Sequence, residues 1–228
     1  MTEVLLQIVG GAFMQANKEA LVNPELRQYV RSHIFPVYSK NDAGHRLDHI
    51  EYVIRRSLAF MEQFENLDAD MVYTAAAYHD VAHYIDKNRH EELSARIFFE
   101  DEVMENFFTD MQRQTIKEAI EDHRASLERA PRSDYGKIIS SADRSTDIDS
   151  FFLRTHAYTL KHFPKLTEKQ RLERCYQHMQ DKYGEGGYAK SYVDDAEYKR
   201  FCEEMKALLH DRKAFERKYQ AVTFTKVG

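Results

Sequence analysis

The stretch Ala75-Ala76-Ala77-Tyr78-His79-Asp80 consists of small apolar residues that end in a paired base and acid. On a helix, Val72, Ala75, Ala76 and His79 recur at the spacing of one buried stripe, so an imidazole points where a leucine would normally lie. A buried polar side chain requires a partner. Residues that close similar apolar stripes elsewhere would supply one, namely His49, His90, His123 and Asp143. This pattern predicts a metal centre inside a helical bundle.

The composition of the 228 residues favours helices. Only 8 glycines and 4 prolines are present, and long stretches rich in Glu, Lys, Arg, Ala, Leu and Met run without interruption. A chain of this length suits one well-buried core better than two. We therefore expect an all-α fold with one domain over residues 1–228. In it, a metal-binding core at 44–150 carries additional C-terminal helices at 151–228, which pack on that core as a wall or lid or instead serve a partner subunit.

Helical periodicity and capping residues predict where the helices lie. We expect loops at residues 39–44, 86–88 and 184–187, where turn-forming residues gather. The expected helices cover residues 2–17, 24–38 and 47–64, then the segments that carry His79 with Asp80, His90, His123 and Asp143, and finally residues 147–162, 167–183 and 192–215. Five of these helices would each contribute candidate ligands at the same level of the bundle.

The charge pattern and the absence of targeting signals limit the classes of partner. The net charge is −5 with acids and bases interleaved, so no basic stripe indicates a nucleic-acid partner. The two cysteines, Cys175 and Cys202, show no disulfide framework, and the N-terminus lacks a secretory signal. No apolar run approaches the roughly 20 residues that span a bilayer. We expect a cytoplasmic protein with no membrane or nucleic-acid partner, and homo-oligomerisation is left open.

Imidazole nitrogens and carboxylate oxygens from separate helices are suitable ligands for divalent transition metals. The ligands expected for a first ion are His49, His79, Asp80 and Asp143. A second ion would take His90 and His123 with Asp80 as the bridge, at the separation of about 3.5–4 Å typical of two-metal hydrolytic sites. Neighbouring helical residues diverge by about 100°, so His79 and Asp80 share one site only if other segments enclose that helix end. We expect one or two ions of Fe, Mn, Zn, Co or Ni, and favour iron or manganese for a pair.

The ordered set of His49, His79 with Asp80, His90, His123 and Asp143 resembles the HD superfamily of metal-dependent phosphohydrolases, over about residues 44–150. The matching motifs are Gly-His-Arg-Leu-Asp-His-Ile at 44–50, Ala-Tyr-His-Asp-Val at 77–81 and Ile-Ile-Ser-Ser-Ala-Asp-Arg at 138–144. The resemblance implies a mononuclear core of His49, His79, Asp80 and Asp143. Binuclear members add two histidines, and His90 and His123 occupy those places.

The resemblance also implies a reaction. It indicates a hydrolase in which a metal-bound hydroxide cleaves a phosphomonoester or phosphoanhydride of a small molecule, most plainly a nucleotide. The ligand layout is similar to that of symmetrical dinucleoside tetraphosphate hydrolases. The sequence after His123 departs from the Gly-Tyr-Pro signature of cyclic-dinucleotide phosphodiesterases, and Val81-Ala82-His83-Tyr84 replaces the Glu-Asp pair of alarmone hydrolases. We therefore discount the cyclic dinucleotide as a substrate, and the alarmone pattern is absent.

Substrate phosphates require cationic partners, and arginine side chains suit phosphate oxygens. Each candidate for substrate binding lies within a few residues of an expected ligand: Arg46, Arg89, Arg124 and Arg144. The candidates for catalysis are Asp80, His83 and Arg144. For His45 three interpretations are open: a metal ligand in the loop, a proton carrier or an exposed residue. Exposure is the default. Tyr78 and Tyr84 either flank a base or serve packing.

Other interpretations are compatible with parts of the sequence. A structural ion pair would explain His79 with Asp80, and surface positions beside acidic residues would explain His90 and His123. The spacing of His79 and His83 imitates a zinc-peptidase motif, but the intervening acid there is glutamate and aspartate would be too short. For the whole protein, the alternatives are a di-iron oxygenase of the HD superfamily and a non-catalytic nucleotide-binding sensor. Oxygen consumption and the survival of bound nucleotide distinguish these from a hydrolase.

Overall fold

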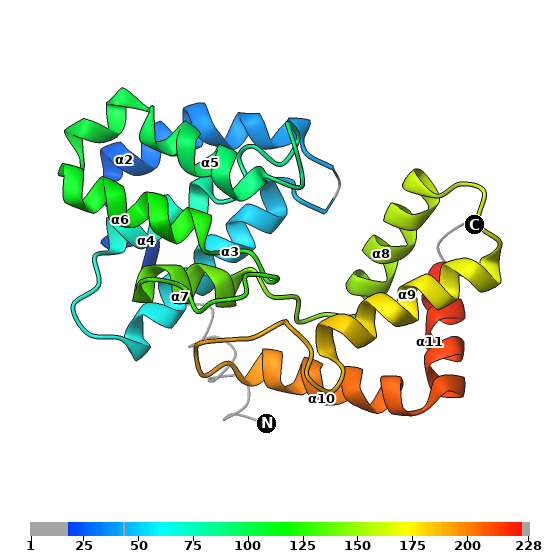
Figure 1. Ribbon diagram of the computed structural model, residues 1–228. Coiled ribbons are helices and arrows are strands. Elements are labelled where there is room, and N and C mark those ends of the chain that lie inside the picture. Colours follow the sequence, from blue (N-terminus) through cyan, green and yellow to red (C-terminus); the bar gives the residue numbers. More distant parts are fainter. Residues whose placement is uncertain (1–17, 43, 225–228) are drawn as a thin grey trace, which may run out of the picture. The chain divides into compact units, whose positions relative to one another are not determined.

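The computed structural model describes residues 18–42 and 44–224, which form two compact units that divide between Asp143 and Arg144 (Figure 1). Every regular element in these described ranges is a helix, so the predicted all-α fold is confirmed. The helix expected at 2–17 lies outside the described residues. The single-domain organisation, with residues 151–228 packing on the core, stays a prediction, and each unit is described here by itself.

The first helical segment changes its winding along its length. Asn23 caps it by accepting hydrogen bonds from the backbone N–H groups of Glu25 and Leu26, and Pro24 occupies the first helical position. Instead of one α-helix over 24–38, the chain forms α2 (Pro24–Tyr29), a π-helical turn (Val30–Ile34) and a 3₁₀ helix (Phe35–Lys40). Pro36 has no N–H to continue the α-helical ladder, which accounts for the change near this point.

Five further α-helices lie in the described residues of the first unit, and α4 is central among them. They are α3 (Leu47–Phe60), α4 (Ala69–Tyr78), α5 (His90–Phe99), α6 (Asp110–Glu121) and α7 (Asp134–Ala142). Helix α4 contacts all four of the others. Its residues from Met71 to Tyr78 are all buried, so the apolar stripe expected from sequence is in fact a helix that is buried all round.

The second unit contains four α-helices that share one apolar core. They are α8 (Ile148–His162), α9 (Glu168–Tyr183), α10 (Ala196–His210) and α11 (Arg212–Phe224). Phe152, Cys175, Met205 and Phe215 contribute side chains from all four helices to this core. The single helix expected over 192–215 is wrong, because the backbone leaves the helical region at Asp211, which then caps α11.

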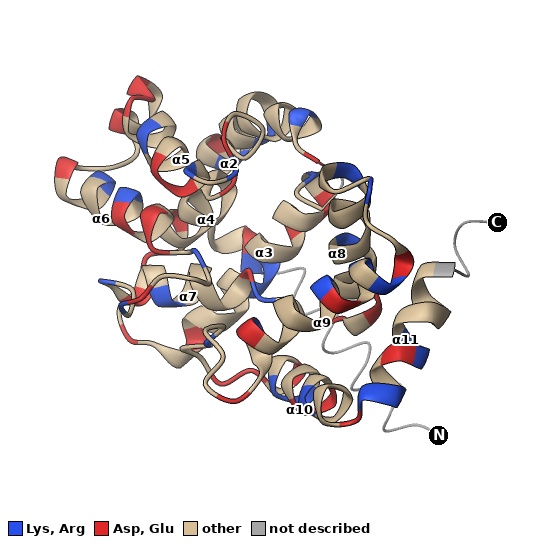
Figure 2. Cartoon of the chain, turned by 45° about the vertical axis from the view of Figure 1, so that its right-hand side comes forward, with Lys and Arg blue, Asp and Glu red and all other residues tan. Residues whose placement is uncertain are grey.

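Acidic and basic positions are interspersed along several helices of both units, as the interleaved charges in the sequence indicate (Figure 2). Basic and acidic positions both occur on α6, α9 and α11. Among the described helices, none combines the length and apolarity required to span a bilayer.

Candidate metal centre

All six predicted ligands lie at or beside helix ends. His49 occupies the first turn of α3 and His90 is the first residue of α5. Helix α4 ends at Tyr78, so His79 is its C-cap and Asp80 lies in the following turn, outside the helix on which the sequence placed them. His123 follows α6 by two residues, and Asp143 is the C-cap of α7. Five helices therefore deliver these side chains to one region.

The first group of side chains contains two imidazoles and two carboxylates. His49 Nε2 lies 3.1 Å from Asp143 Oδ1 and 3.9 Å from Asp80 Oδ2. His79 Nε2 lies 3.5 Å from Asp80 Oδ2 and 3.9 Å from Asp143 Oδ1. The structure thus brings together the four residues that the sequence assigned to a first ion. The turn after Tyr78 lets His79 and Asp80 converge, which consecutive positions within a regular helix would not.

The second group shares Asp80 with the first. His90 Nε2 lies 3.2 Å and His123 Nε2 lies 3.5 Å from Asp80 Oδ1, and the two ring nitrogens are 3.0 Å apart. His123 is 1% exposed, and the His90 side chain is 12% exposed. Neither residue is therefore an exposed surface histidine. The two oxygens of Asp80 face different pairs of imidazoles, which is the arrangement of a bridging carboxylate.

Backbone carbonyls set the orientation of three of the imidazoles. The Nδ1 atom of His79 lies 2.8 Å from Ala76 O, that of His90 lies 2.9 Å from Lys87 O, and that of His123 lies 2.6 Å from Ile120 O. A carbonyl oxygen only accepts, so each Nδ1 must carry the hydrogen and donate it. In the neutral ring this leaves the Nε2 lone pair toward Asp80. Ligating histidines commonly use such a second hydrogen bond to hold their orientation.

This donor set fits a metal ion. Within the described part of the chain, the buried His79 Nε2 makes no hydrogen bond. His90 and His123 place two nitrogens 3.0 Å apart, so a proton or another cation is required between their lone pairs and the carboxylate. A divalent ion satisfies the convergent nitrogens and oxygens together, and imidazole with carboxylate is a set that transition metals accept.

Residues 46–146 match the family model of the HD domain. This segment is an HD domain. HD domains bind divalent metal ions and generally act as hydrolases, and the match confirms the resemblance inferred from the sequence. No curated protein and no solved structure matches the chain.

Burial and mutual proximity change the proton affinities of the HD-domain side chains. Burial lowers the pKa of His79 to about 4. Burial also lowers the pKa of His90, and His123 adds to the effect. Although burial acts in the opposite direction, the neighbouring imidazoles, His79 first, hold the pKa of the Asp80 carboxyl well below its usual range. Neutral imidazoles around ionised carboxylates are the protonation states that metal binding requires.

The metal-free protein should lose stability as the pH falls from 6.5 to about 4. In that range the unfolded chain protonates His79, whereas the folded chain, with the pKa of this imidazole near 4, does not. The free energy of unfolding therefore decreases on acidification. We expect His79→Asn to weaken this pH dependence by about one proton, because the amide does not titrate and still donates to Ala76 O.

Urea unfolding of chelator-treated wild type and variant at several pH values measures the difference. The comparison with the variant is necessary because, although burial acts in the opposite direction, the Asp80 carboxylate raises the pKa of His123, which therefore contributes with the opposite sign. An identical pH dependence in the two proteins would show that His79 is not held neutral by its burial.

The arginines predicted to bind substrate occupy different environments. Arg124 donates to Asn88 O and pairs with Glu91 at 2.8 Å, and Glu91 Oε2 lies 3.2 Å from His90 Nδ1. Arg89 is exposed and pairs with Glu92. Arg46 is exposed at the N-cap of α3. Arg144 belongs to the second unit, where it is buried and its Nε donates to Lys190 O. Their roles in substrate binding stay predictions.

The structure gives different positions to the remaining candidates. Tyr78 is buried and donates a hydrogen bond to Asp101 Oδ2, so it serves packing, whereas Tyr84 is 41% exposed. His83, predicted to be catalytic, stacks on His45 with ring centroids 3.8 Å apart, and the centroid of His90 is 5.2 Å away. His45 is 33% exposed, so the default of a freely exposed side chain is wrong.

The sequence analysis missed Asn41 and Asp42. The Asn41 side chain is buried and donates to the carbonyls of His45 and Asp80, while its oxygen accepts from Tyr84 N–H. Asp42 accepts a hydrogen bond from the His45 ring. In the sequence both residues belong to a polar loop, and the only signals that this loop approaches the site are His45, four residues before His49, and His83, four residues after His79.

Proposed function

We propose that the HD domain is a metal-dependent phosphohydrolase that cleaves a phosphomonoester or phosphoanhydride of a small molecule, most plainly a nucleotide. The observation that carries this proposal is the position of Asp80. Its two oxygens each face a pair of imidazole nitrogens within 3.2–3.9 Å. This is a ligand set for two ions with one bridging carboxylate, an arrangement suited to in-line displacement at phosphorus.

The side chains of the HD domain would bind and orient the ions. His49, His79, Asp80 and Asp143 would hold one ion, and His90 and His123 with Asp80 would hold the other. The ions would be one or two of Fe, Mn, Zn, Co or Ni, because this ligand set does not discriminate among them. When bound, they supply a water of lowered pKa and positive charge opposite the phosphoryl oxygens. His79 and Asp80 are buried.

The candidates for catalysis and substrate binding act around these ions. Asp80 would act by direct contact with both, and His83 from the edge of the centre. Arg124 would bind a substrate phosphate by exchanging its ion pair with Glu91, in which the Arg124 side chain is 37% exposed and the Glu91 side chain 16% exposed. Arg46, Arg89 and Arg144 are the further candidates for phosphate contacts, and Arg144 also for catalysis.

The proposal is tested by incubating the protein with nucleotides under anaerobic conditions, after loading with each candidate metal. Mononucleotides and a symmetrical dinucleoside tetraphosphate form the substrate panel, and chromatography with a phosphate assay detects the products. We expect hydrolysis without oxygen, and none after chelation. Stoichiometric oxygen consumption would instead indicate the di-iron oxygenase. A nucleotide that binds tightly and survives with every metal would indicate the sensor.

A further inference from the structure

We propose that Asp42, His45 and His83 form an additional binding site for a divalent transition-metal ion such as Zn²⁺. We call these three residues the outer group. Asp42 and His45 lie before residue 46, where the HD-domain match begins. The outer group shares no residue with the six ligands of the candidate metal centre. Its existence therefore does not depend on the proposed hydrolase activity.

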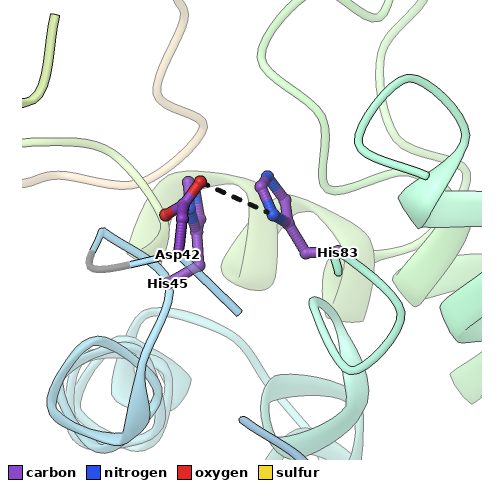
Figure 3. A group of neighbouring side chains, drawn as sticks. All are labelled: Asp42, His45 and His83. Atoms are coloured by element: carbon purple, nitrogen blue, oxygen red, sulfur yellow. Dashed lines mark hydrogen bonds and ion pairs between the residues drawn. The ribbon is translucent and has the colours of Figure 1, made fainter. Parts of the chain in front are cut away.

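The three side chains converge from two segments of the first unit. Asp42 and His45 lie in the irregular segment after the 3₁₀ helix, and His83 lies in the turns that follow α4 (Figure 3). Asp42 Oδ1 lies 2.7 Å from His45 Nδ1, and Asp42 Oδ2 lies 4.0 Å from His83 Nδ1. One ligand atom from each residue lies within 4.8 Å of the other two. A carboxylate and two imidazoles are the ligand types that zinc takes in open, non-structural sites.

Buried hydrogen bonds hold the two segments together. The Asn41 amide is 4% exposed and donates to His45 O and to Asp80 O, both at 3.0 Å. Its oxygen accepts from Tyr84 N–H at 2.9 Å, next to His83. The Gly44 N–H also donates to Asp42 Oδ1. Because one buried amide joins the residues beside both histidines, the outer group is a preorganised site and not a chance meeting of mobile side chains.

The charges within the outer group also suit a cation. The hydrogen bond from His45 holds the pKa of the Asp42 carboxyl well below its usual range, so this side chain is anionic. His83 offers a ring nitrogen 4.0 Å from Asp42 Oδ2, and a neutral imidazole there would supply a lone pair. A proton lies between Asp42 Oδ1 and His45 Nδ1 in the hydrogen bond that joins them. A metal ion would replace that proton and use the same two ligand atoms.

Only a small rearrangement is required for coordination. Ligand atoms about 2.1 Å from a tetrahedral ion lie roughly 3.4 Å from one another. The separation between Asp42 Oδ2 and His83 Nδ1 is 4.0 Å, and the Asp42 side chain is 47% exposed, so it can rotate toward the ring. The three residues would leave at least one coordination position open to water.

Zinc titration of the chelator-treated, full-length protein tests the outer group. With two ions in the candidate metal centre and one in the outer group, we expect the wild type to bind three equivalents and Asp42→Asn two, as measured by calorimetry and by elemental analysis after dialysis; the difference of one equivalent is the test. The substitution keeps the shape of an exposed side chain and should leave folding unchanged. Asp110→Asn is the matched control, because its carboxylate is exposed and distant from any histidine cluster, and it should retain three equivalents.

Combination with Asp80→Ala separates this proposal from the proposed function. Asp80→Ala should retain one equivalent of zinc, and the double variant with Asp42→Asn should retain none. His45→Gln provides a second way to remove an outer ligand and should also bind one equivalent fewer than wild type. Unchanged stoichiometry in Asp42→Asn and His45→Gln would overturn the outer group. Unchanged stoichiometry in Asp80→Ala alone would instead overturn the candidate metal centre.

Discussion

Asp80→Ala should remove the ions of the candidate metal centre and abolish nucleotide hydrolysis. Asp80 is the residue that both ligand groups share, with its oxygens 3.2–3.9 Å from the ring nitrogens of His49, His79, His90 and His123. Loss of a partner that merely supports a ligand costs about 10–100-fold in metal affinity. Loss of the bridging ligand should therefore cost more than about 100-fold, and activity should fall with metal content.

Elemental analysis and product formation, measured on the same preparation, check this prediction. Far-ultraviolet circular dichroism should show that the variant remains helical. Asp110→Ala, which removes an exposed carboxylate, should keep both metal content and activity. A variant at Asp80 that retained the wild-type metal content would refute the ligand assignment, and one that lost the metal but kept its activity would refute the metal-dependent reaction.

His123→Ala should remove one ion of the centre and leave the other. His123 Nε2 approaches Asp80 Oδ1 and His90 Nε2, whereas His49 and Asp143 pair with each other on the opposite side of Asp80. The first ion would thus keep its four ligands. We expect the rate of hydrolysis to fall by about 100-fold or more, because the phosphoryl oxygens lose one of two neutralising cations.

Metal stoichiometry at equal protein concentration distinguishes the outcomes for this variant. His33→Ala is the control, because His33 is exposed and its ring hydrogen-bonds to Tyr29 O in its own helical segment. If His123→Ala retained both ions, His123 would be a structural residue. If it lost both, the two groups around Asp80 would act as one indivisible site.

Helix formation could be predicted closely from local sequence. Thr109 with Gln112 and Thr167 with Gln170 form capping boxes at the starts of α6 and α9, and such signals lie within four residues of one another. The predictions were wrong where packing or backbone geometry intervened. The segment 24–38 winds into π and 3₁₀ turns, and the helix expected at 192–215 breaks at Asp211.

The candidate site was predictable to a similar extent. His79, His123 and Asp143 end apolar stretches, and the order of histidines and aspartates along the chain is visible without coordinates. The end of α4 at Tyr78 could not be predicted from the sequence. The turn that follows Tyr78 lets His79 and Asp80 face one centre. Asn41 and Asp42 gave no local signal, because their hydrogen bonds reach residues that are distant along the chain or belong to a loop.

Periodicity, capping and motif order are properties of neighbouring residues, so the helical fold, the HD domain and the six candidate metal ligands could be predicted from the sequence. The positions of two pairs of imidazoles around the two oxygens of Asp80, and the grouping of Asp42, His45 and His83, became visible only in the folded chain. Those arrangements depend on distances between separate segments, which are set when helices pack around α4 and when a buried amide joins two loops.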